Sequence, residues 1–379
     1  MGPEAAPVAD ALVPDVHRIA VLRPAAALGD LIVTLPALEA LRAAYPDAEI
    51  VLLGAEWQRP LLARRRSPVD RLVVVPPVAG VTAPRAGERE DDGAVELFCA
   101  SLRAERVDLA LQLHGGGRYS NPFVRRLGAR VAAGLAGEDA DPLDRSVPYV
   151  PFQPEVLRFL EAAALVGADP VTLEPRLDVT EDDLAAADEL LPPLGGAPLA
   201  VVHPGATDAR RRWPPERFAA VADELARAGA RVVLTGVDAE RETAEAVVAA
   251  AATPLLSLVG RLSLTGLVGV LARAAVVVGN DTGPLHLAAA VGTPTVGIYW
   301  CGNFLSWGPL GRARHRPAIS WVTECPVCGA DCTGDAWPGR PAPPRCAHDP
   351  SFVVRVSIDE VAAAAVDLLA ATEAGDRAA

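Results

Sequence analysis

The chain has 379 residues, 51% of them hydrophobic, which is enough apolar surface for about two or three domains with their own cores. The formal net charge is −13, and no lysine occurs, so the strongly basic side chains are all arginines. This balance excludes broad nucleic-acid binding, which needs a basic face that displaces counterions, and leaves arginines as the candidate anion ligands. Because no apolar run could span a bilayer and residues 1–14 lack a signal-peptide pattern, we expect a cytoplasmic protein.

Short apolar runs alternate with helical patterns through the first half of the chain. The clearest helix spans Leu31–Ala44, and another covers Glu155–Val166. This βαβ rhythm is typical of a parallel sheet with helices on both faces. A stretch rich in proline, glycine and acidic residues over 169–198 marks a domain boundary. The expected strands are His17–Arg23, Glu49–Leu53, Arg71–Val75, Asp108–Leu113 and Arg130–Gly134.

The rhythm restarts at Leu199 and predicts a second doubly wound domain, which hints at a duplication of structure. We expect a disordered tail over 1–16, one domain over 17–185, another over 186–357, and a helix over 358–379 that packs back across the domain junction. Residues 301–350 are expected to be irregular. The other elements predicted in this half are Leu199–His203, Pro215–Ala228, Arg231–Thr235, Ala239–Ala250, Ser263–Arg273, Ala275–Gly279, Thr295–Tyr299 and Ile358–Ala371.

The loops that follow the strands are the candidate binding regions, because ligands of open parallel sheets lie beyond the carboxyl ends of the strands. With two such domains, both sets of loops can face one central cleft. These loops are Pro24–Asp30, His114–Asn121, His203–Trp213, Gly236–Glu240 and Asn280–His286.

The last of these loops carries the strongest signal for an anion site. An apolar run leads into Gly279-Asn-Asp-Thr-Gly-Pro-Leu-His286 and a helical run leads out, which gives the order strand, tight turn and helix start. Backbone N–H groups at a helix start lack intrahelical partners and can hold a phosphate or diphosphate. A capped helix without a ligand is the alternative. Asp281-Thr-Gly also spells the aspartic-protease triplet, but it occurs once and on a βα turn.

Three sequence blocks resemble glycosyltransferase family 9, the lipopolysaccharide heptosyltransferase-like enzymes. The blocks are Arg23-Pro-Ala-Ala-Ala-Leu-Gly-Asp30 with Thr34-Leu-Pro-Ala37, then His203-Pro-Gly-Ala-Thr-Asp-Ala-Arg-Arg-Arg-Trp213-Pro, and then Asp281-Thr-Gly-Pro-Leu-His286. The resemblance implies the GT-B fold, which has two Rossmann-like α/β domains facing a central cleft. The N-terminal domain would bind the acceptor, and the C-terminal domain the nucleotide sugar.

The resemblance also implies the donor site. The diphosphate would lie against Thr282, Gly283 and Pro284, while Asp281 and His286 would shape the turn, with His286 able to reach the phosphate. Arg211 stands where the family carries a basic phosphate ligand, and it can pair with a diphosphate and neutralise the leaving group. A solvated charge run is the alternative for this arginine.

Two further donor contacts follow from the same resemblance. Thr207 stands where hydroxyl residues are common in the family, whereas Ala206 departs from that pattern. Glu240, or else Asp238, would accept hydrogen bonds from the ribose of the donor. A surface acid at a helix start is the alternative for these acidic residues.

Asp30 is the candidate catalytic residue, because it aligns with the catalytic aspartate of the resembled family. Its carboxylate would take the proton from an acceptor hydroxyl while that oxygen attacks the anomeric carbon, which inverts the configuration. The alternative is a plain helix N-cap, since Gly-Asp precedes an apolar helix. The two roles are compatible.

The glycine-rich loop His114–Asn121 is the candidate acceptor site, because small residues permit close approach and polar groups can bind hydroxyls. We single out His114, Gly115, Arg118 and Asn121. The alternative is a flexible loop without a ligand, and the loop lacks the spaced-glycine dinucleotide fingerprint.

A cysteine cluster lies near the end of the chain. Cys325, Cys328, Cys332 and Cys346, with His348 nearby, supply enough soft ligands for one tetrahedral structural zinc. Reduced thiols and disulfides are the alternatives. No Asp-x-Asp metal-nucleotide motif stands in a convincing place, so we expect catalysis to need no metal cofactor.

The sequence therefore predicts an inverting glycosyltransferase that moves a sugar, with heptose the family's example, from a nucleotide diphosphate to a glycan or glycolipid hydroxyl. An ADP-sugar is the favoured donor, nucleic acid is not expected as a partner, and the acceptor could draw the protein to a membrane surface. The alternatives are a nucleotide-sugar epimerase or hydrolase of similar fold, and a non-catalytic sugar-nucleotide-binding protein. The sequence names neither the sugar, the base, the acceptor nor the oligomeric state.

Overall fold

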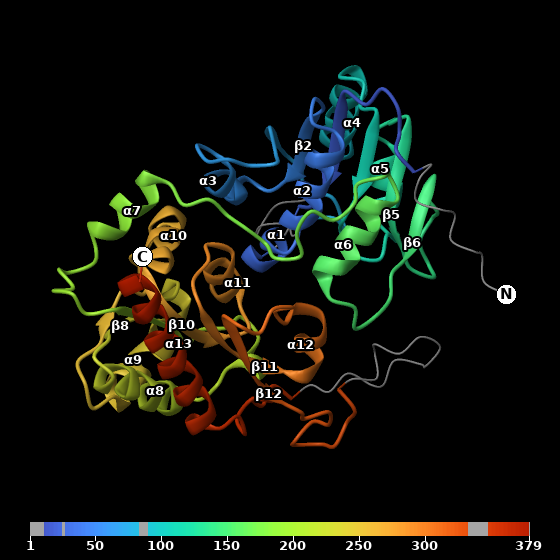
Figure 1. The fold of residues 1–379 in the computed structure, drawn as a ribbon. Helices are drawn as coiled ribbons and strands as arrows, with labels where there is room; N and C mark the ends of the chain where they lie inside the picture. The colour runs from blue at the N-terminus through green and yellow to red at the C-terminus, as the bar shows by residue number, and fades with distance from the viewer. Residues whose placement is uncertain (1–10, 25–26, 83–89, 333–347, 379) are drawn as a thin grey trace. The chain divides into compact units, whose positions relative to one another are not determined.

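The computed structural model describes residues 11–24, 27–82, 90–332 and 348–378. The chain divides into two compact units, residues 1–175 and 176–379, each built on one six-stranded parallel sheet (Figure 1). The predicted fold class of two doubly wound α/β domains is thereby confirmed. None of the described helices combines the length and apolarity that a membrane span requires.

Helices cover both faces of the sheet in the first unit. Successive side chains of a strand point to opposite faces, and because most of the strand residues are apolar, both faces have to be buried. Its elements are β1 (Arg18–Leu22), α1 (Leu28–Ile32), α2 (Leu35–Ala44), β2 (Glu49–Gly54), η2 (Glu56–Gln58), α3 (Arg59–Leu62), β3 (Arg71–Val74), α4 (Asp92–Ala104), β4 (Leu109–Gln112), α5 (Ser120–Arg125), β5 (Val131–Ala136), β6 (Arg145–Pro148) and α6 (Glu155–Ala164). On β1, Ala20 and Leu22 pack in a core cluster with α4 and α5. Ile19 and Val21 are fully buried on the other side of the strand, and α2 packs against α6.

The second unit repeats this construction. Its elements are α7 (Glu181–Asp188), β7 (Leu199–His203), η3 (Ala209–Arg211), α8 (Pro215–Arg227), β8 (Arg231–Leu234), η4 (Asp238–Glu240), α9 (Arg241–Ala250), β9 (Leu256–Ser257), α10 (Leu264–Arg273), β10 (Ala274–Asn280), α11 (Gly283–Ala290), β11 (Thr295–Trp300), α12 (Cys301–Trp307), β12 (His315–Ser320) and α13 (Ile358–Ala378). One face of the sheet packs with α8, α9 and α13 in a single core cluster (Figure 1).

Both sheets have the same strand order. The first runs β3-β2-β1-β4-β5-β6, and the second runs β12-β11-β10-β7-β8-β9, which is the same order read from the opposite edge. The order reverses between β1 and β4 and between β7 and β10. Loops leave such a pair of strands in opposite directions and open a crevice at the carboxyl edge of the sheet. The loops after these four strands hold most of the predicted site residues.

The start of the second unit differs from the prediction. Residues 176–185 belong to this unit and not to the first domain, because the Leu177 N–H donates to the Ala290 carbonyl at 2.9 Å and α7 packs on α10. The last helix, α13, buries Val361 and Leu368 against its own unit's sheet. Apolar side chains that recur on one face of α13 account for this.

Two other segments are more regular than expected. Residues 301–350 were predicted to be irregular, yet they supply α12 and the edge strand β12, whose register pairs Thr295 with His315. Of the predicted tail, residues 11–16 are ordered, because the Val13 N–H donates to the Tyr45 hydroxyl at 3.1 Å, whereas residues 1–10 lie outside the described chain. The helix predicted over Leu31–Ala44 breaks into α1 and α2, with a proline in the first turn of α2.

The close contact between α7 and α10 requires a residue without a side chain, Gly269. A Cβ atom at Gly269 would lie 1.9 Å from the Asp183 carbonyl oxygen, so we expect Gly269→Ala to lower the free energy of unfolding by about 1–3 kcal/mol. Gly266 on the same helix is the matched control, since its Cβ would meet nothing closer than 3.4 Å. Gly266→Ala should be neutral or stabilising by up to about 1 kcal/mol. Urea unfolding of both variants measures the difference, and equal effects would contradict the packing argument.

Candidate active site

Asp30 lies on the first loop of unit 1, but it is not the N-cap that the alternative reading predicted. It is the third residue of α1, and Ala27 is the N-cap. Its carboxylate reaches back, so that Oδ2 accepts a hydrogen bond from the Ala27 N–H at 3.1 Å. The side chain remains 23% exposed. The geometry therefore combines a structural role with access for a reactant.

Arg23 holds the other oxygen of this carboxylate. Its Nη2 donates to Asp30 Oδ1 at 3.1 Å, and its Nη1 donates to the Leu113 carbonyl at 3.0 Å. The guanidinium also lies 4.8 Å from the ring centre of Phe159 on α6. Arg23 is only 5% exposed. Its guanidinium contacts the carboxylate of Asp30, the carbonyl that follows β4 and a ring on α6, and so it links these three parts of unit 1. One lone pair on each carboxylate oxygen is left for a proton.

A second buried arginine lies in the same charged cluster. Arg158 on α6 is 1% exposed, and Tyr149 covers its guanidinium at 3.8 Å. Its Nε lies 3.2 Å from Glu155 Oε1 as an ion pair, and its Nη2 donates to the Gln153 carbonyl at 3.3 Å, but neither Nε nor Nη1 has a hydrogen-bond partner among the described residues. Burial raises the pKa of the Glu155 carboxyl, whereas Arg158 and Arg23 oppose that rise. Unit 1 thus gathers two buried cations and two carboxyl groups near one edge of its sheet.

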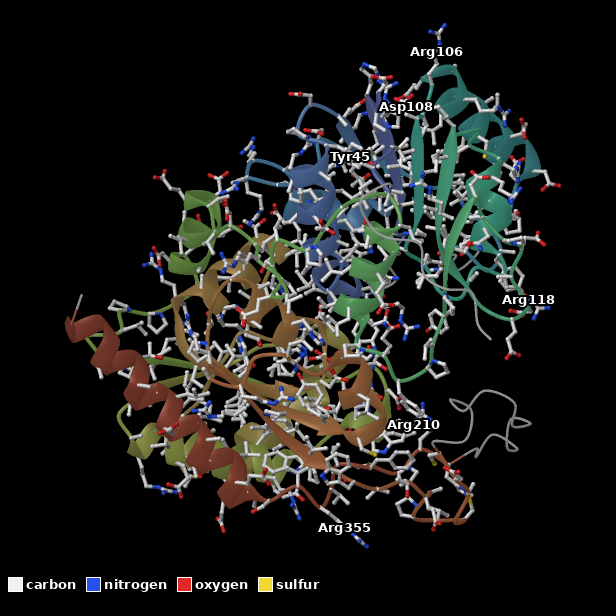
Figure 2. All side chains as sticks on the ribbon, turned by 45° about the vertical axis from the view of Figure 1, so that its right-hand side comes forward. Tyr45, Arg106, Asp108, Arg118, Arg210 and Arg355 are labelled. Carbon is white, nitrogen blue, oxygen red and sulfur yellow. The ribbon has the colours of Figure 1, made fainter. Side chains whose placement is uncertain are left out.

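The predicted acceptor loop divides into exposed and buried residues. Arg118 is 63% exposed and pairs with Asp139 at 3.2 Å (Figure 2). Gly115 is also exposed, with φ +61°. Asn121 is fully buried and is placed differently from the prediction, because its amide donates to the carbonyls of Leu135 and Asp141 and holds two loops together. Its neighbour Gly117 must be glycine, since a Cβ would lie 2.5 Å from Asn121 Nδ2.

His114, in the same loop, interacts electrostatically with Arg23 and Asp30. The pKa of His114 is lowered to about 4, chiefly by burial and also by the charge of Arg23, while the charge of Asp30 opposes both. The imidazole is therefore neutral at neutral pH. Its Nδ1 is buried and has no hydrogen-bond partner in the described part of the chain. A neutral ring of this kind can exchange a hydrogen bond with a sugar hydroxyl without adding charge.

The second unit brings Arg211 to the start of α11. Its Nη1 donates to the Asp281 carbonyl oxygen at 2.9 Å, although the two residues are 70 positions apart in sequence. The Arg211 Nε is buried without a partner among the described residues, and a quarter of the side chain is exposed. Thr282 is the N-cap of α11, and Gly283 and Pro284 form its first turn. A cation and a helix start therefore stand together, which is the combination that binds diphosphate.

Asp281 itself is a structural centre and not a free ligand. It is 1% exposed, and its Oδ1 lies 3.2 Å from His286 Nε2 while its Oδ2 accepts from Asn303 Nδ2 at 2.9 Å. His286 is 13% exposed and packs against Trp307 with ring centres 6.0 Å apart. The Asn280 side chain accepts from the Trp213 N–H at 3.1 Å and so joins the loops after β7 and β10.

Glu240 lies against the backbone of the loop after β7. A Cβ at Gly205 would lie 2.0 Å from its Oε1, and its Oε2 accepts from the Val237 N–H at 2.9 Å. The same Oε2 is 3.9 Å from His203 Nε2. Burial lowers the pKa of His203. The side chain of Asp238 instead pairs with Arg241, and Thr207 is exposed on the loop that Arg212 braces through the Ala206 carbonyl.

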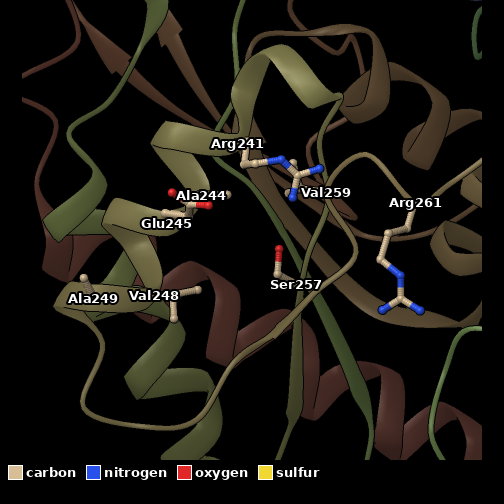
Figure 3. Close-up of a pocket in the computed structure, with 8 residues that line it drawn as sticks. All are labelled: Arg241, Ala244, Glu245, Val248, Ala249, Ser257, Val259 and Arg261. Atoms are coloured by element: carbon tan, nitrogen blue, oxygen red, sulfur yellow. The ribbon is translucent and has the colours of Figure 1, made fainter.

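A cavity of about 380 Å³ lies beside these loops in the second unit (Figure 3). It is at the edge of the sheet, between α9 and the residues that follow β9, and it contains none of the predicted donor residues. Arg241, Glu245 and Arg261 bring charge to the lining, and its other residues are apolar except for Ser257. The lining residues are Arg241, Ala244, Glu245, Val248, Ala249, Ser257, Val259 and Arg261.

Several residues that shape the site were missed in the sequence. Arg23 belongs to the first sequence block but has no predicted role, and Arg158 lies on a helix without a motif. Asn303 falls in the segment predicted to be irregular. An arginine on the buried face of an amphipathic helix is the signal that would have drawn attention to Arg158, because charged residues are rarely fully buried without a partner.

Comparison with known proteins identifies the family. The model of glycosyltransferase family 9 (heptosyltransferase) matches residues 96–323. Lipopolysaccharide heptosyltransferase 2 of Salmonella typhimurium is 29% identical over 293 residues, which cover 72% of this chain and 80% of that protein.

Solved structures agree with this match. A family 9 glycosyltransferase of Veillonella parvula superposes with a TM-score of 0.74 at 22% identity, over 94% of this chain and 97% of that one. A heptosyltransferase of E. coli, solved with ADP, gives a TM-score of 0.58 at 25% identity, over 80% and 93% of the two chains. The family model matches more than half of the chain, and the fold agrees with that of the solved family member. This protein therefore belongs to glycosyltransferase family 9.

Proposed function

We propose that the protein transfers a heptose from an ADP-sugar to a hydroxyl of a lipopolysaccharide-type glycolipid, with inversion at the anomeric carbon. The observation that carries this proposal is the contact of Arg211 with the start of α11, because it assembles an anion site from two distant segments. The similarity to lipopolysaccharide heptosyltransferases, and to one solved with ADP, supports the choice of sugar, nucleotide and acceptor. We place the reaction in the cytoplasm, with the acceptor drawing the enzyme to the membrane surface.

The second unit would bind the donor. The diphosphate would lie between Arg211 and the first turn of α11, where Thr282 and the Gly283 N–H can donate to phosphate oxygens. The unpartnered Nε of Arg211 would then gain an acceptor. As the glycosidic bond breaks, this cation and the helix dipole stabilise the charge that develops on the departing diphosphate, so that no metal cofactor is needed. Glu240 remains the candidate partner of the ribose.

The first unit would supply the base. Asp30 takes the proton of the acceptor hydroxyl while that oxygen forms its bond to the anomeric carbon, and the diphosphate leaves from the opposite face with the electron pair. Arg23 and the Ala27 N–H keep the carboxylate in one orientation. Neutral His114 would hold a second acceptor hydroxyl. The chemistry requires acceptor and donor to meet in a site that excludes water.

The first test separates chemistry from binding at Asp30. Asp30→Asn keeps the size of the side chain but removes the base, so we expect turnover to fall by at least about 10²-fold. Affinity for ADP, measured by calorimetry, should stay within about twofold, because the amide lies on the unit that does not hold the nucleotide. Equal losses of ADP affinity and turnover would show that Asp30 is only structural. Release of free sugar from donor alone by the native protein would favour a hydrolase.

The second test concerns the anion site. Arg211→Ala should weaken ADP binding by about 10- to 100-fold, which corresponds to the loss of about 1.5–3 kcal/mol of charge-assisted hydrogen bonding. Arg227→Ala removes the same charge from an exposed pair with Glu224 on α8 and is the matched control. Affinity for adenosine, which lacks phosphate, should be the same in both variants. An Arg211 variant that binds ADP as tightly as the control would remove the support for this site.

A further inference from the structure

The cysteine segment folds into a tight turn that presents two thiols together. Cys325-Pro-Val-Cys328-Gly329 closes on itself, because the Gly329 N–H donates to the Cys325 carbonyl and the Cys325 N–H donates to the Ala330 carbonyl, both at 2.8 Å. Gly329 has φ +71°, a conformation that glycine adopts without strain. An antiparallel bridge joins Glu324 to Asp331 across the turn. The two thiols are therefore held by backbone geometry and not by chance contact.

A histidine from beyond this turn comes to the same place. The ligand atoms of Cys325, Cys328 and His348 all lie within 4.8 Å of one another. Two sulfur ligands of a tetrahedral zinc ion are separated by about 3.7 Å, given metal–sulfur bonds of about 2.3 Å. Small movements of the exposed Cys328 and His348 side chains would bring the three atoms to that spacing. His348, which the sequence places near the predicted cysteine ligands, thus lies with two of them in the structure, and Cys346 lies outside the described residues.

Cys332, four residues after Cys328, is the candidate fourth soft ligand. The Cys332 N–H donates to the Thr323 carbonyl at 2.8 Å, which fixes the residue at the end of the turn. Its thiol is half-buried and donates to the Ala330 carbonyl at 3.4 Å. The set of three thiols and one imidazole matches the chemistry of closed structural sites for thiolate-binding metals.

The segment that follows His348 is bonded to the loop that carries Arg211. The Phe352 N–H donates to the Arg210 carbonyl at 2.8 Å, and the Ser351 hydroxyl donates to the Arg212 carbonyl at 2.6 Å. Phe352 is 1% exposed and packs against Trp300. Ser351 and Phe352 therefore fix Arg210 and Arg212, the two neighbours of Arg211. The candidate metal ligand His348 lies three residues before Ser351.

We propose that Cys325, Cys328, Cys332 and His348 bind one divalent transition-metal ion of the zinc or ferrous-iron class, and that this ion fixes the anchor of the Arg211 loop. On binding, the thiols release their protons to solvent and the sulfurs and one imidazole nitrogen donate electron pairs to the metal, with no change of oxidation state. The ion is structural and takes no part in the glycosyl transfer. The link to ADP binding rests on the proposed function, whereas the metal site itself does not.

The first test measures metal content. Full-length protein, purified without chelators and analysed by elemental mass spectrometry, should hold about one equivalent of zinc or iron per chain. Cys328→Ser and His348→Ala, both on exposed side chains, should each lower this to a small fraction. Cys99→Ala, which removes a buried thiol of the first unit, should leave it unchanged. Absence of metal in the native protein, after growth and refolding with either ion, would overturn the site, as would full metal content in both ligand variants.

The second test asks what the ion does. Removing it with a chelator should weaken ADP binding by about tenfold, and restoring zinc or ferrous iron should recover it, while near-ultraviolet circular dichroism shows that the core remains folded. Unchanged ADP affinity in the folded, metal-free protein would overturn the coupling to the Arg211 loop. If the metal-loaded protein binds one equivalent of ion but no ADP, the metal site stands and the proposed function fails.

Discussion

The reversal of strand order in each sheet is the constraint on which the site depends. Neighbouring parallel strands whose connections run to opposite faces of the sheet leave a gap at their carboxyl ends, because no helix covers that point. In unit 1 the gap lies after β1 and β4, and in unit 2 after β7 and β10. Asp30 and His114 follow the first pair, and Arg211 and Thr282 follow the second. Arg211 and Asp281, 70 positions apart in sequence, are in hydrogen-bond contact at the second gap.

Two arginines organise the candidate site: Arg23, which is 5% exposed, and Arg211, whose side chain is 25% exposed. A charged side chain is costly to bury unless its hydrogen bonds are satisfied, so a nearly buried guanidinium indicates a defined task. The guanidinium of Arg23 donates to the Asp30 carboxylate and to the Leu113 carbonyl, and so it holds the carboxylate in one position. Arg211 has one donor committed and one without a described partner. A planar guanidinium can donate hydrogen bonds to two acceptors on different sides at once, and a lysine ammonium does this less well.

The two units use one topology for different chemistry. In unit 1 the crevice loops carry a carboxylate that a buried arginine and a backbone N–H hold in one orientation. In unit 2 they carry a cation and a helix start, which suits the binding of an anion. The difference lies only in the residues placed on equivalent loops, which is the usual way in which one fold supports several functions.

The sequence by itself determined the repeating βαβ architecture, because alternating apolar runs and amphipathic helices have distinct periods. It also placed Asp30, Arg211 and the Asp281–His286 turn on loops after strands, and their blocks were enough to indicate the family. It could not show that Asp30 is the third residue of a helix, that Asn121 is buried, or that His348 lies beside Cys325 and Cys328. Such facts depend on contacts between residues distant in sequence, such as the Asn121 amide with the carbonyls of Leu135 and Asp141. Tertiary structure alone decided them, since packing and hydrogen bonding select one arrangement among several that the local pattern allows.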